Sequence, residues 1–153
     1  MMFRAQIHTW VLVALCGVGC ASASLDAPAG FARLDASDEF AWRAVSADGV
    51  VLAVRDVPNR PEANLAFWSH TVDERLRVRG YARDGEAREV RNRDGVAGTQ
   101  FRYDRDEEGR AHRYWVTVFV RGSHVYVVEA GGDRETFDPA RDAVERAVAT
   151  LRW

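Results

Sequence analysis

The segment Tyr114–Ala130, YWVTVFVRGSHVYVVEA, carries the densest run of β-branched and aromatic residues in this 153-residue chain. Its two apolar halves flank Arg121-Gly122-Ser123-His124, and a short Gly-containing turn between such runs predicts a β-hairpin. Side chains alternate between the two faces of a strand, so a turn at Gly122-Ser123 decides which residues share a face. One face then carries Val116, Val118, Val120, Val125 and Val127, and the other carries Trp115, Phe119, Tyr126 and Val128. Both faces are apolar, so we expect this hairpin to lie in a sheet that is covered on both sides.

The composition predicts one globular domain with a balanced surface. The chain is 47% hydrophobic and 29% charged, and its 21 basic and 23 acidic residues leave a formal net charge of -2. Such a balance provides no extended positive field for nucleic acid, so we expect no nucleic-acid partner. All the basic residues are Arg, and the absence of Lys excludes Schiff-base chemistry and a phosphate-loop lysine.

The N-terminal residues predict export from the cytoplasm. Arg4 supplies the positive charge that precedes the apolar stretch Trp10–Val18, which is too short to span a bilayer. We interpret residues 1–19 as a signal peptide of the lipoprotein type.

Two cleavage sites compete at the end of this signal. Val18-Gly19-Cys20 resembles a bacterial lipobox, although Gly17 stands where Leu is usual, whereas Ala21-Ser22-Ala23 would direct an ordinary signal peptidase to cut after residue 23. Lipidation of Cys20 is favoured because this is the last Cys of the chain and small residues follow it. The residue after Cys20 is not Asp, which resembles lipoproteins sent to the outer membrane. We therefore expect an outer membrane lipoprotein facing the periplasm, anchored through Cys20.

Residues 20–36 lack a sustained hydrophobic period and predict a tether, which leaves residues 37–153 as a single domain. That domain is expected to open with a hairpin. Its strands are Phe40–Val45 and Val50–Val54, and Asp48-Gly49 supplies the turn.

The next element is predicted to be an amphipathic helix over Pro61–Arg79. Asn59 and Glu62 have the spacing of a capping box, and Pro61 suits the first turn of a helix. The opposite face, which includes Asp73 and Glu74, is expected to be solvated. The apolar stripe consists of Leu65, Trp68, Val72 and Leu76.

A second, more polar hairpin and a closing helix complete the chain. Arg88–Arg91 and Val96–Tyr103 flank the turn residues Asp94-Gly95. Asp138 before Pro139 predicts the N-terminus of a helix that extends to about Arg152. Its apolar stripe consists of Val144, Ala147, Val148 and Leu151.

These elements predict an α+β fold with the order ββαββββα. It would be a three-layer αβα sandwich, with a mostly antiparallel sheet of about six strands between two main helices. Since the central hairpin is apolar on both faces, the two helices should cover opposite sides of the sheet.

The arrangement resembles the PsbP-like superfamily, which includes small bacterial lipoproteins. The resemblance extends from Phe40 to Trp153. It depends on the Asp48-Gly49 hairpin, the Leu65-Ala66-Phe67-Trp68 start of the helix that reaches Gly80-Tyr81, Asp94-Gly95-Val96-Ala97-Gly98, the central runs Val118–Val120 and Val125–Ala130, and Phe137 before the closing helix. It implies a non-catalytic accessory domain and identifies no functional residue.

One helix face carries three residues with the spacing of metal ligands. His70, Asp73 and Glu74 stand at i, i+3 and i+4, so their side chains can share one face. The paired-His motif of zinc peptidases is missing, however, and a solvated helix face is the simpler hypothesis.

An acidic segment resembles the start of a calcium-binding loop. Asp104, Asp106 and Glu108 alternate as the first ligands of such a loop do, and Gly109 follows them. The twelfth position, which requires a bidentate carboxylate, is Trp115. We therefore expect no metal and no cofactor, and keep this segment only as a weak calcium candidate.

The sequence contains no recognisable set of catalytic residues. Ser69-His70 and Ser123-His124 are adjacent pairs without the surroundings of a nucleophile, so we expect the protein not to be an enzyme. The first hypothesis is an exported, lipid-anchored protein whose domain binds an envelope protein or supports an assembly. The alternative is a periplasmic carrier or sensor of a small amphiphilic ligand, held between sheet and helix, with Trp68 and Trp115 as the aromatics facing the ligand.

Overall fold

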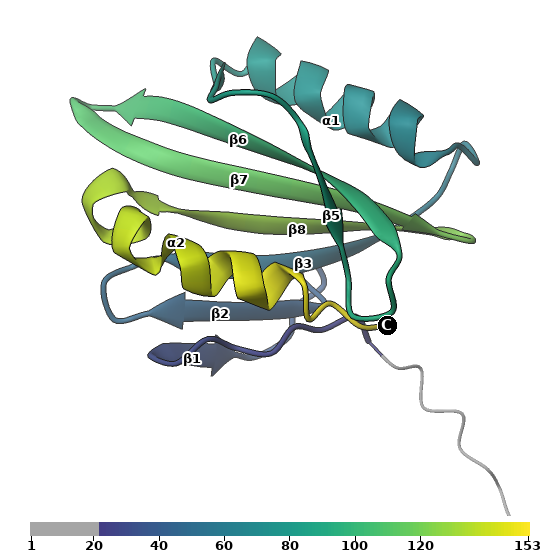
Figure 1. Ribbon diagram of the computed structural model, residues 1–153, viewed down its shortest axis with the longest axis horizontal. Helices are drawn as coiled ribbons and strands as arrows, with labels where there is room; N and C mark the ends of the chain where they lie inside the picture. The colour runs from purple at the N-terminus through teal and green to yellow at the C-terminus, as the bar shows by residue number, and fades with distance from the viewer. Residues whose placement is uncertain (1–21) are drawn as a thin grey trace, which may run out of the picture.

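The computed structural model describes residues 22–153, which form three layers (Figure 1). The expected signal peptide, residues 1–19, and the expected lipidation site, Cys20, lie outside the described residues. Within residues 22–153, no helix has both the length and the apolar character needed to cross a membrane.

The middle layer is an antiparallel sheet, for which residues 22–153 supply eight strands. They are β1 (Phe31–Leu34), β2 (Trp42–Ser46), β3 (Val51–Pro58), β4 (Ala82–Arg83), β5 (Arg88–Arg91), β6 (Ala97–Glu107), β7 (Arg110–Arg121) and β8 (His124–Asp133). Their order in space is β1-β2-β3-β8-β7-β6-β4, and β5 also pairs with β6. The predicted α+β class and antiparallel sheet are confirmed, although the sheet has more strands than the six expected. Strands β1 and β4 were not predicted from the sequence. Strand β1 is largely exposed and so has no apolar alternation, and β4 has only two residues.

The predicted hairpin forms the centre of this sheet. Strands β7 and β8 pair with Arg121 opposite His124, so the turn consists of Gly122 and Ser123 as expected. Gly122 has a φ of +54°, a conformation that glycine adopts without strain. The valine face and the aromatic face of the hairpin contribute to two separate apolar cores, which confirms that both faces are buried.

The two helices cover opposite faces of the sheet, as the sequence predicted. Helix α1 (Leu65–Val78) packs on β6 and β7, and helix α2 (Arg134–Val148) packs on β8 and β7 from the other side (Figure 1). The core under α1 contains the valine face of the hairpin, and the core under α2 contains Trp115, Phe119 and Tyr126.

The predicted capping box of the first helix is wrong. Helix α1 begins at Leu65, and its N-cap is Asn64, whose side chain accepts a hydrogen bond of 3.0 Å from the backbone N–H of Phe67. Asn59 and Glu62 lie in the preceding connection. This connection carries the chain from the end of β3 to the position of α1 over β6 and β7.

Asn59 instead joins the start of α1 to the central turn. Its amide donates hydrogen bonds to the carbonyls of Ala63 and Gly122, at 3.1 and 3.0 Å. Its side-chain oxygen accepts hydrogen bonds from the backbone of Ala63 and the indole N–H of Trp68. Its own backbone N–H donates to the carbonyl of Ser123 at 2.8 Å. Asn59 is buried, and these bonds satisfy its polar groups where water cannot.

Helix α2 begins five residues before the predicted start at Pro139. Its N-cap is Asp133 rather than Asp138, and Pro139 lies inside the helix. Phe137 explains the earlier start, because its ring is fully buried and packs edge-on against Trp115 with the ring centroids 4.9 Å apart. This packing outweighs the backbone hydrogen bond that Pro139 cannot donate.

The prediction that residues 20–36 form a tether is wrong for the part that the structure describes. Ala23 and Leu25 are 1% and 2% exposed, and both belong to the core under α2. Ser24 forms two backbone hydrogen bonds with Arg152, of 2.9 and 3.0 Å. Two apolar side chains spaced by two residues suffice to place one face of a short extended segment in the core, although they are too few to form a recognisable period.

Candidate functional site

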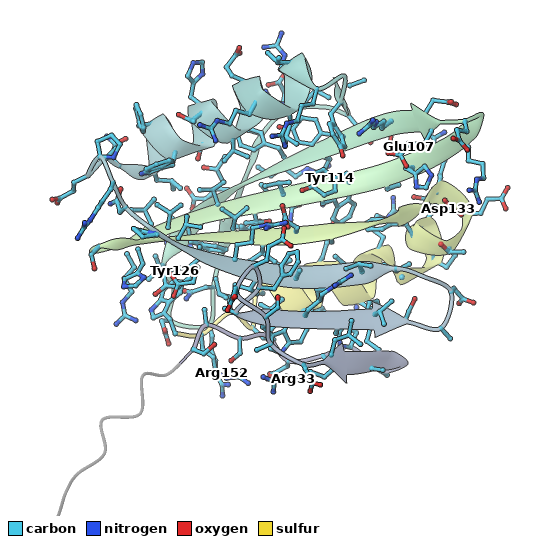
Figure 2. All side chains as sticks on the ribbon, turned by 180° about the vertical axis from the view of Figure 1, so that it is seen from behind. Arg33, Glu107, Tyr114, Tyr126, Asp133 and Arg152 are labelled. Atoms are coloured by element: carbon cyan, nitrogen blue, oxygen red, sulfur yellow. The ribbon has the colours of Figure 1, made fainter. Side chains whose placement is uncertain are left out.

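Helix α1 covers only part of its side of the sheet. It packs over β6 and β7, and within residues 22–153 no helix covers the adjoining region of β8, β3 and β2 (Figure 2). The connection between β1 and β2 partly shields this region, since the guanidinium groups of Arg55 and Arg43 lie 4.2 and 5.3 Å from the centre of the Phe40 ring. The surface left between this connection and α1 is concave.

Two adjoining cavities, which we call the sheet groove, occupy this concave surface. The first has a volume of about 390 Å³ and is lined by Phe40, Arg43, Asp48, Gly49, Val51, Ala53, His112, Tyr114, Glu129, Gly131, Gly132 and Asp133. The second has a volume of about 370 Å³, lies along the edge of α1, and is lined by Glu39, Arg55, Val72, Arg75, Leu76, Arg79, Tyr114, Val116, Val127 and Glu129. Tyr114 and Glu129 line both cavities, and each volume is within the range of small-molecule sites.

A charged network forms the floor between the two cavities. Glu129 on β8 accepts hydrogen bonds from the Tyr114 hydroxyl at 2.7 Å and from Nε of Arg55 at 2.9 Å. Arg55 on β3 also donates to Glu39 at 2.6 Å. Gly131 makes room for this arrangement, because a Cβ at that position would lie 3.2 Å from the Tyr114 ring. The network fixes four side chains, from three strands and the β1–β2 connection, in one arrangement.

The surroundings hold both Tyr114 and Arg55 in their protonated forms. Burial, followed by the charge of Glu129 and its hydrogen bond, raises the pKa of Tyr114 well above its ordinary value. Burial alone would lower the pKa of Arg55, but hydrogen bonds and charge from Glu39 and Glu129 outweigh it and raise the pKa. Tyr114 is therefore a poor general base, and the network is suited to structure and recognition rather than to proton transfer.

Arg43 on β2 is a cation of the first cavity whose buried Nε has no acceptor among the described residues. Its Nε is buried without a hydrogen-bond acceptor, and the residues that the structure describes form no ion pair with it. A buried donor without an acceptor is costly, which makes this guanidinium ready to bind an incoming carboxylate or other anion.

The other end of the first cavity carries a second polar cluster. Nδ1 of His112 lies 3.1 Å from a carboxylate oxygen of Asp133, and its Nε2 lies 3.8 Å from Glu107. Asp48 belongs to the turn between β2 and β3 and also lines the cavity. The groove is therefore acidic at this end, and Arg43 lies further along the sheet.

The two candidate ligand-facing tryptophans serve as packing residues. Trp68 on α1 donates its indole N–H to Asn59 at 2.6 Å. Trp115 on β7 is buried between Phe137 and the guanidinium of Arg102, which lies 3.9 Å from its ring centre. The structure places neither of them among the residues that line the sheet groove.

The candidate metal face of the first helix is divided between core and solvent. Asp73, expected to be solvated, is buried and accepts hydrogen bonds from the Tyr103 hydroxyl at 2.7 Å and from Arg83 at 3.1 Å. Glu74 pairs with Arg77 on the surface. Asp73 points towards the sheet because the helix packs through the row that also contains Ser69 and Leu76.

The acidic segment does not form a calcium loop. Asp104 and Asp106 lie within strand β6, whose hairpin with β7 turns at Glu108 and Gly109. Asp104 accepts hydrogen bonds from Arg113 at 2.6 Å and from Arg134 at 2.7 Å, while Asp106 accepts one from the backbone of Gly109. Among the residues that the structure describes, no group of three or more His, Cys, Asp or Glu side chains is placed to hold a metal ion.

The groove residues were not predicted from the sequence, although one signal was present. A turn at Gly122-Ser123 places Val116 opposite Glu129, so Tyr114 and Glu129 are diagonal neighbours on one face. Glu129 is the one charged residue in the otherwise apolar run Val125–Ala130, and this position should have indicated a polar site. Arg43 and Arg55 could not be found in this way, because their place depends on the order of strands in the sheet.

No family model and no curated protein matches the sequence, but solved structures match its fold. LpqN from Mycobacterium tuberculosis, a protein involved in cell envelope biogenesis, is similar with a TM-score of 0.68 and 12% identity, over 86% of this chain and 83% of that one. PA94 from Pseudomonas aeruginosa, a protein of unknown function, is similar with a TM-score of 0.59 and 15% identity, over 80% and 81% of the two chains.

The cyanobacterial PsbP protein CyanoP from Synechocystis sp. PCC 6803 is also similar. Its TM-score is 0.52 at 14% identity, and the match covers 92% of this chain and 98% of that one. Identities at this level establish the fold alone. The chain has a PsbP-like fold, as the resemblance of its sequence implied.

Proposed function

We propose that this chain is an exported, lipid-anchored envelope protein whose non-catalytic domain binds a protein partner in the sheet groove. The observation that carries the proposal is the open part of the α1 side of the sheet, where a concave surface of apolar and charged residues includes the guanidinium of Arg43, whose buried Nε has no acceptor. The export signal and the lipobox-like Val18-Gly19-Cys20 support the location. The similarity to LpqN, which is involved in cell envelope biogenesis, is consistent with it.

The chemistry of the groove favours a protein over an amphiphile. Small apolar ligands are usually enclosed, whereas this groove is open, and charged side chains of Glu39, Arg43, Asp48, Arg55 and Glu129 stand among its apolar lining residues. Protein interfaces commonly combine a polar rim with aromatic and Arg residues. We expect the partner to place a carboxylate against Arg43, beside the ring of Phe40.

A carrier of a small amphiphilic ligand is the second candidate. It is favoured by the cavity at the edge of α1, whose apolar lining includes Val72, Leu76, Val116 and Val127. Native mass spectrometry of the protein extracted from membranes would test it, since a carrier should retain a ligand of constant mass. A protein that is always empty would contradict the carrier hypothesis.

Site-specific photocrosslinking in intact cells tests the partner hypothesis. A photoreactive phenylalanine analogue at Val51, which lines the groove, should form a discrete adduct after irradiation. The same analogue at Val78, which is 84% exposed on the outer side of α1, is the matched control and should not. Equal adducts at the two positions, or none at Val51, would contradict binding in the groove.

The role of Arg43 is tested in the same assay. Arg43→Gln keeps much of the side chain but removes its charge, so the adduct at Val51 should weaken by about tenfold or more. Arg33→Gln, on the adjacent strand and exposed, is the control and should leave the adduct unchanged. An unchanged adduct in Arg43→Gln would exclude recognition of a carboxylate by this residue.

Lipidation requires a separate test. Cells labelled with a radioactive fatty acid should incorporate label into the wild-type chain and not into Cys20→Ala. An unlabelled wild type, or an equally labelled variant, would show that Cys20 is not the anchor.

A further inference from the structure

The start of the described chain is held firmly at one end of the sheet. Ser24 is paired with Arg152, and the backbone N–H of Asp26 donates a hydrogen bond of 2.9 Å to the Thr150 side chain. Ala23 and Leu25 are buried. The chain therefore leaves the domain at a fixed point and in a fixed direction.

The spacing between this point and the lipidation site is very short. Cys20 precedes Ser22 by two residues, and two fully extended residues span at most about 7 Å. The inference that follows rests on the proposed lipidation of Cys20. An acylated Cys20 would have its chains in the bilayer, so this end of the domain must lie within the depth of the lipid headgroups.

The side chains at this end suit such a position. Trp153 follows Arg152 directly and stacks on Tyr126 with the ring centres 4.8 Å apart. The guanidinium of Arg121 lies 5.2 Å from the Trp153 ring, and the described residues form no ion pair with it. Tryptophan is enriched at membrane interfaces, and arginine can bind lipid phosphates through bidentate hydrogen bonds. The carboxylate of Asp26 also lies here, where Arg152 neutralises it at 2.6 Å.

The acidic end of the sheet groove lies at the other end of the domain. Figure 2 shows Tyr126 and Arg152 on the side where the described chain begins, and Glu107 and Asp133 on the far side. Strand β8 runs between the two ends from His124 to Asp133, which corresponds to about 30 Å of extended chain.

We propose that the domain stands on the membrane with its Trp153–Arg121 end in the headgroup region, and that the groove opens into the periplasm at the end marked by Asp133. The occupant of the lower surface is the phospholipid bilayer that holds the Cys20 anchor. The short connection sets the orientation of the domain, so the groove faces partners in solution or on an opposing surface.

Fluorescence quenching by lipids tests this orientation. The full-length acylated protein is reconstituted in vesicles of phosphatidylethanolamine and phosphatidylglycerol with a quencher attached to the headgroup. An environment-sensitive dye is placed at Ser123→Cys in the β7–β8 turn or at Glu107→Cys near the far end. Acylation occupies Cys20, so the introduced thiol is the only one in the mature chain. Quenching should be several-fold stronger at position 123 than at position 107.

Further variants test the short connection and the arginine at the membrane end separately. A flexible Gly/Ser insertion of about a dozen residues between Ala21 and Ser22 gives a reach of roughly 20 Å, and should bring quenching at position 123 down towards that at position 107. Arg121→Ala should reduce quenching at position 123, whereas Arg110→Ala, an exposed arginine at the far end, should not. Equal quenching at both positions in the acylated protein, or no effect of the insertion, would overturn the orientation.

The acylation state separates this proposal from the proposed function. Mass spectrometry of the reconstituted chain reports the lipid on Cys20 independently of the dye. A chain without lipid would overturn the anchor and the orientation together, whereas an acylated chain with equal quenching would overturn the orientation alone.

Discussion

The two faces of the sheet differ in how completely they are covered. On the α2 side, the helix, the segment from Ala23 to Leu25 and the C-terminal residues enclose one continuous core that includes Trp42, Phe119 and Phe137. On the α1 side, the core lies under the helix alone, and the rest of the face forms the sheet groove. One face of the sheet therefore supplies most of the burial, and the other retains a surface for recognition.

This division explains why the charged network of the groove is tolerated. The closed α2 face stabilises the whole sheet through its buried apolar surface. The other face can therefore carry charged residues in the groove, although they bury less apolar surface. Open binding surfaces on a rigid scaffold are a general way to combine stability with recognition. The comparison predicts that substitutions on the closed face cost stability, whereas substitutions in the groove cost binding.

Phe137→Ala should have the largest effect. Phe137 is fully buried on the closed face and packs against Trp115, so its removal should lower the free energy of unfolding by about 3–5 kcal/mol. The matched control is Phe67→Ala on the outer side of α1, where Phe67 is 47% exposed and the loss should be below about 1 kcal/mol. Urea unfolding of the two variants measures both values. A similar loss in the two would remove the distinction between the faces.

Asp73→Ala should have an intermediate effect. It leaves the buried Tyr103 hydroxyl without an acceptor and Arg83 without its partner, so we expect a loss of about 1–3 kcal/mol. Glu74→Ala, the adjacent residue, removes only an exposed pair with Arg77 and should cost less than about 0.5 kcal/mol. The double variant Asp73→Ala, Tyr103→Phe should recover part of the stability. No difference between Asp73→Ala and Glu74→Ala in urea unfolding would show that this buried contact does not hold α1 on the sheet.

Alkaline pH should have the smallest effect. Burial, followed by interaction with Asp73, raises the pKa of Tyr103, and burial with Glu129 raises that of Tyr114. Unfolded tyrosine has a pKa of about 10, so above that pH the unfolded chain loses protons that the folded protein keeps. These two groups should leave stability unchanged well below pH 10 and lower it from there, by on the order of 1 kcal/mol together at pH about 10. Replacing both residues by Phe should flatten this dependence in urea unfolding, and a fall of the same size in that variant would assign it to other groups.

Much of the fold could be predicted because its signals are local. The hairpin around Gly122-Ser123, the Asp48-Gly49 and Asp94-Gly95 turns and the two helices on opposite faces all follow from hydrophobic period and turn residues. The segment before β2 could not be predicted, because Ala23 and Leu25 flank Ser24, whose backbone partner Arg152 is more than a hundred positions later in the chain. The start of α2 was missed for a similar reason, since the contact of Phe137 with Trp115 outweighs the boundary that Pro139 normally indicates.

The candidate site was harder to predict than the fold. Its charged residues come from the β1–β2 connection, β2, β3 and β8, and only the order of strands brings them together. The sequence pointed to Trp68 and Trp115 because aromatic residues commonly bind ligands, but both are used for packing. Asp73 was expected on the solvated face of the helix but is buried. The spacing of residues along a helix does not reveal that the Tyr103 hydroxyl on the sheet lies opposite its carboxylate.

The pairing of Ser24 with Arg152 bears on when this chain can acquire its structure. Ala23 and Leu25 share their core with Ala147, Val148 and Leu151, and the pairing that holds Ser24 in place needs a residue 128 positions later in the chain. Contacts of such long range form late and slow the folding of β-rich domains. A chain that emerges N-terminus first, from a ribosome or through a membrane pore, therefore cannot complete this domain until its last turn of helix has followed.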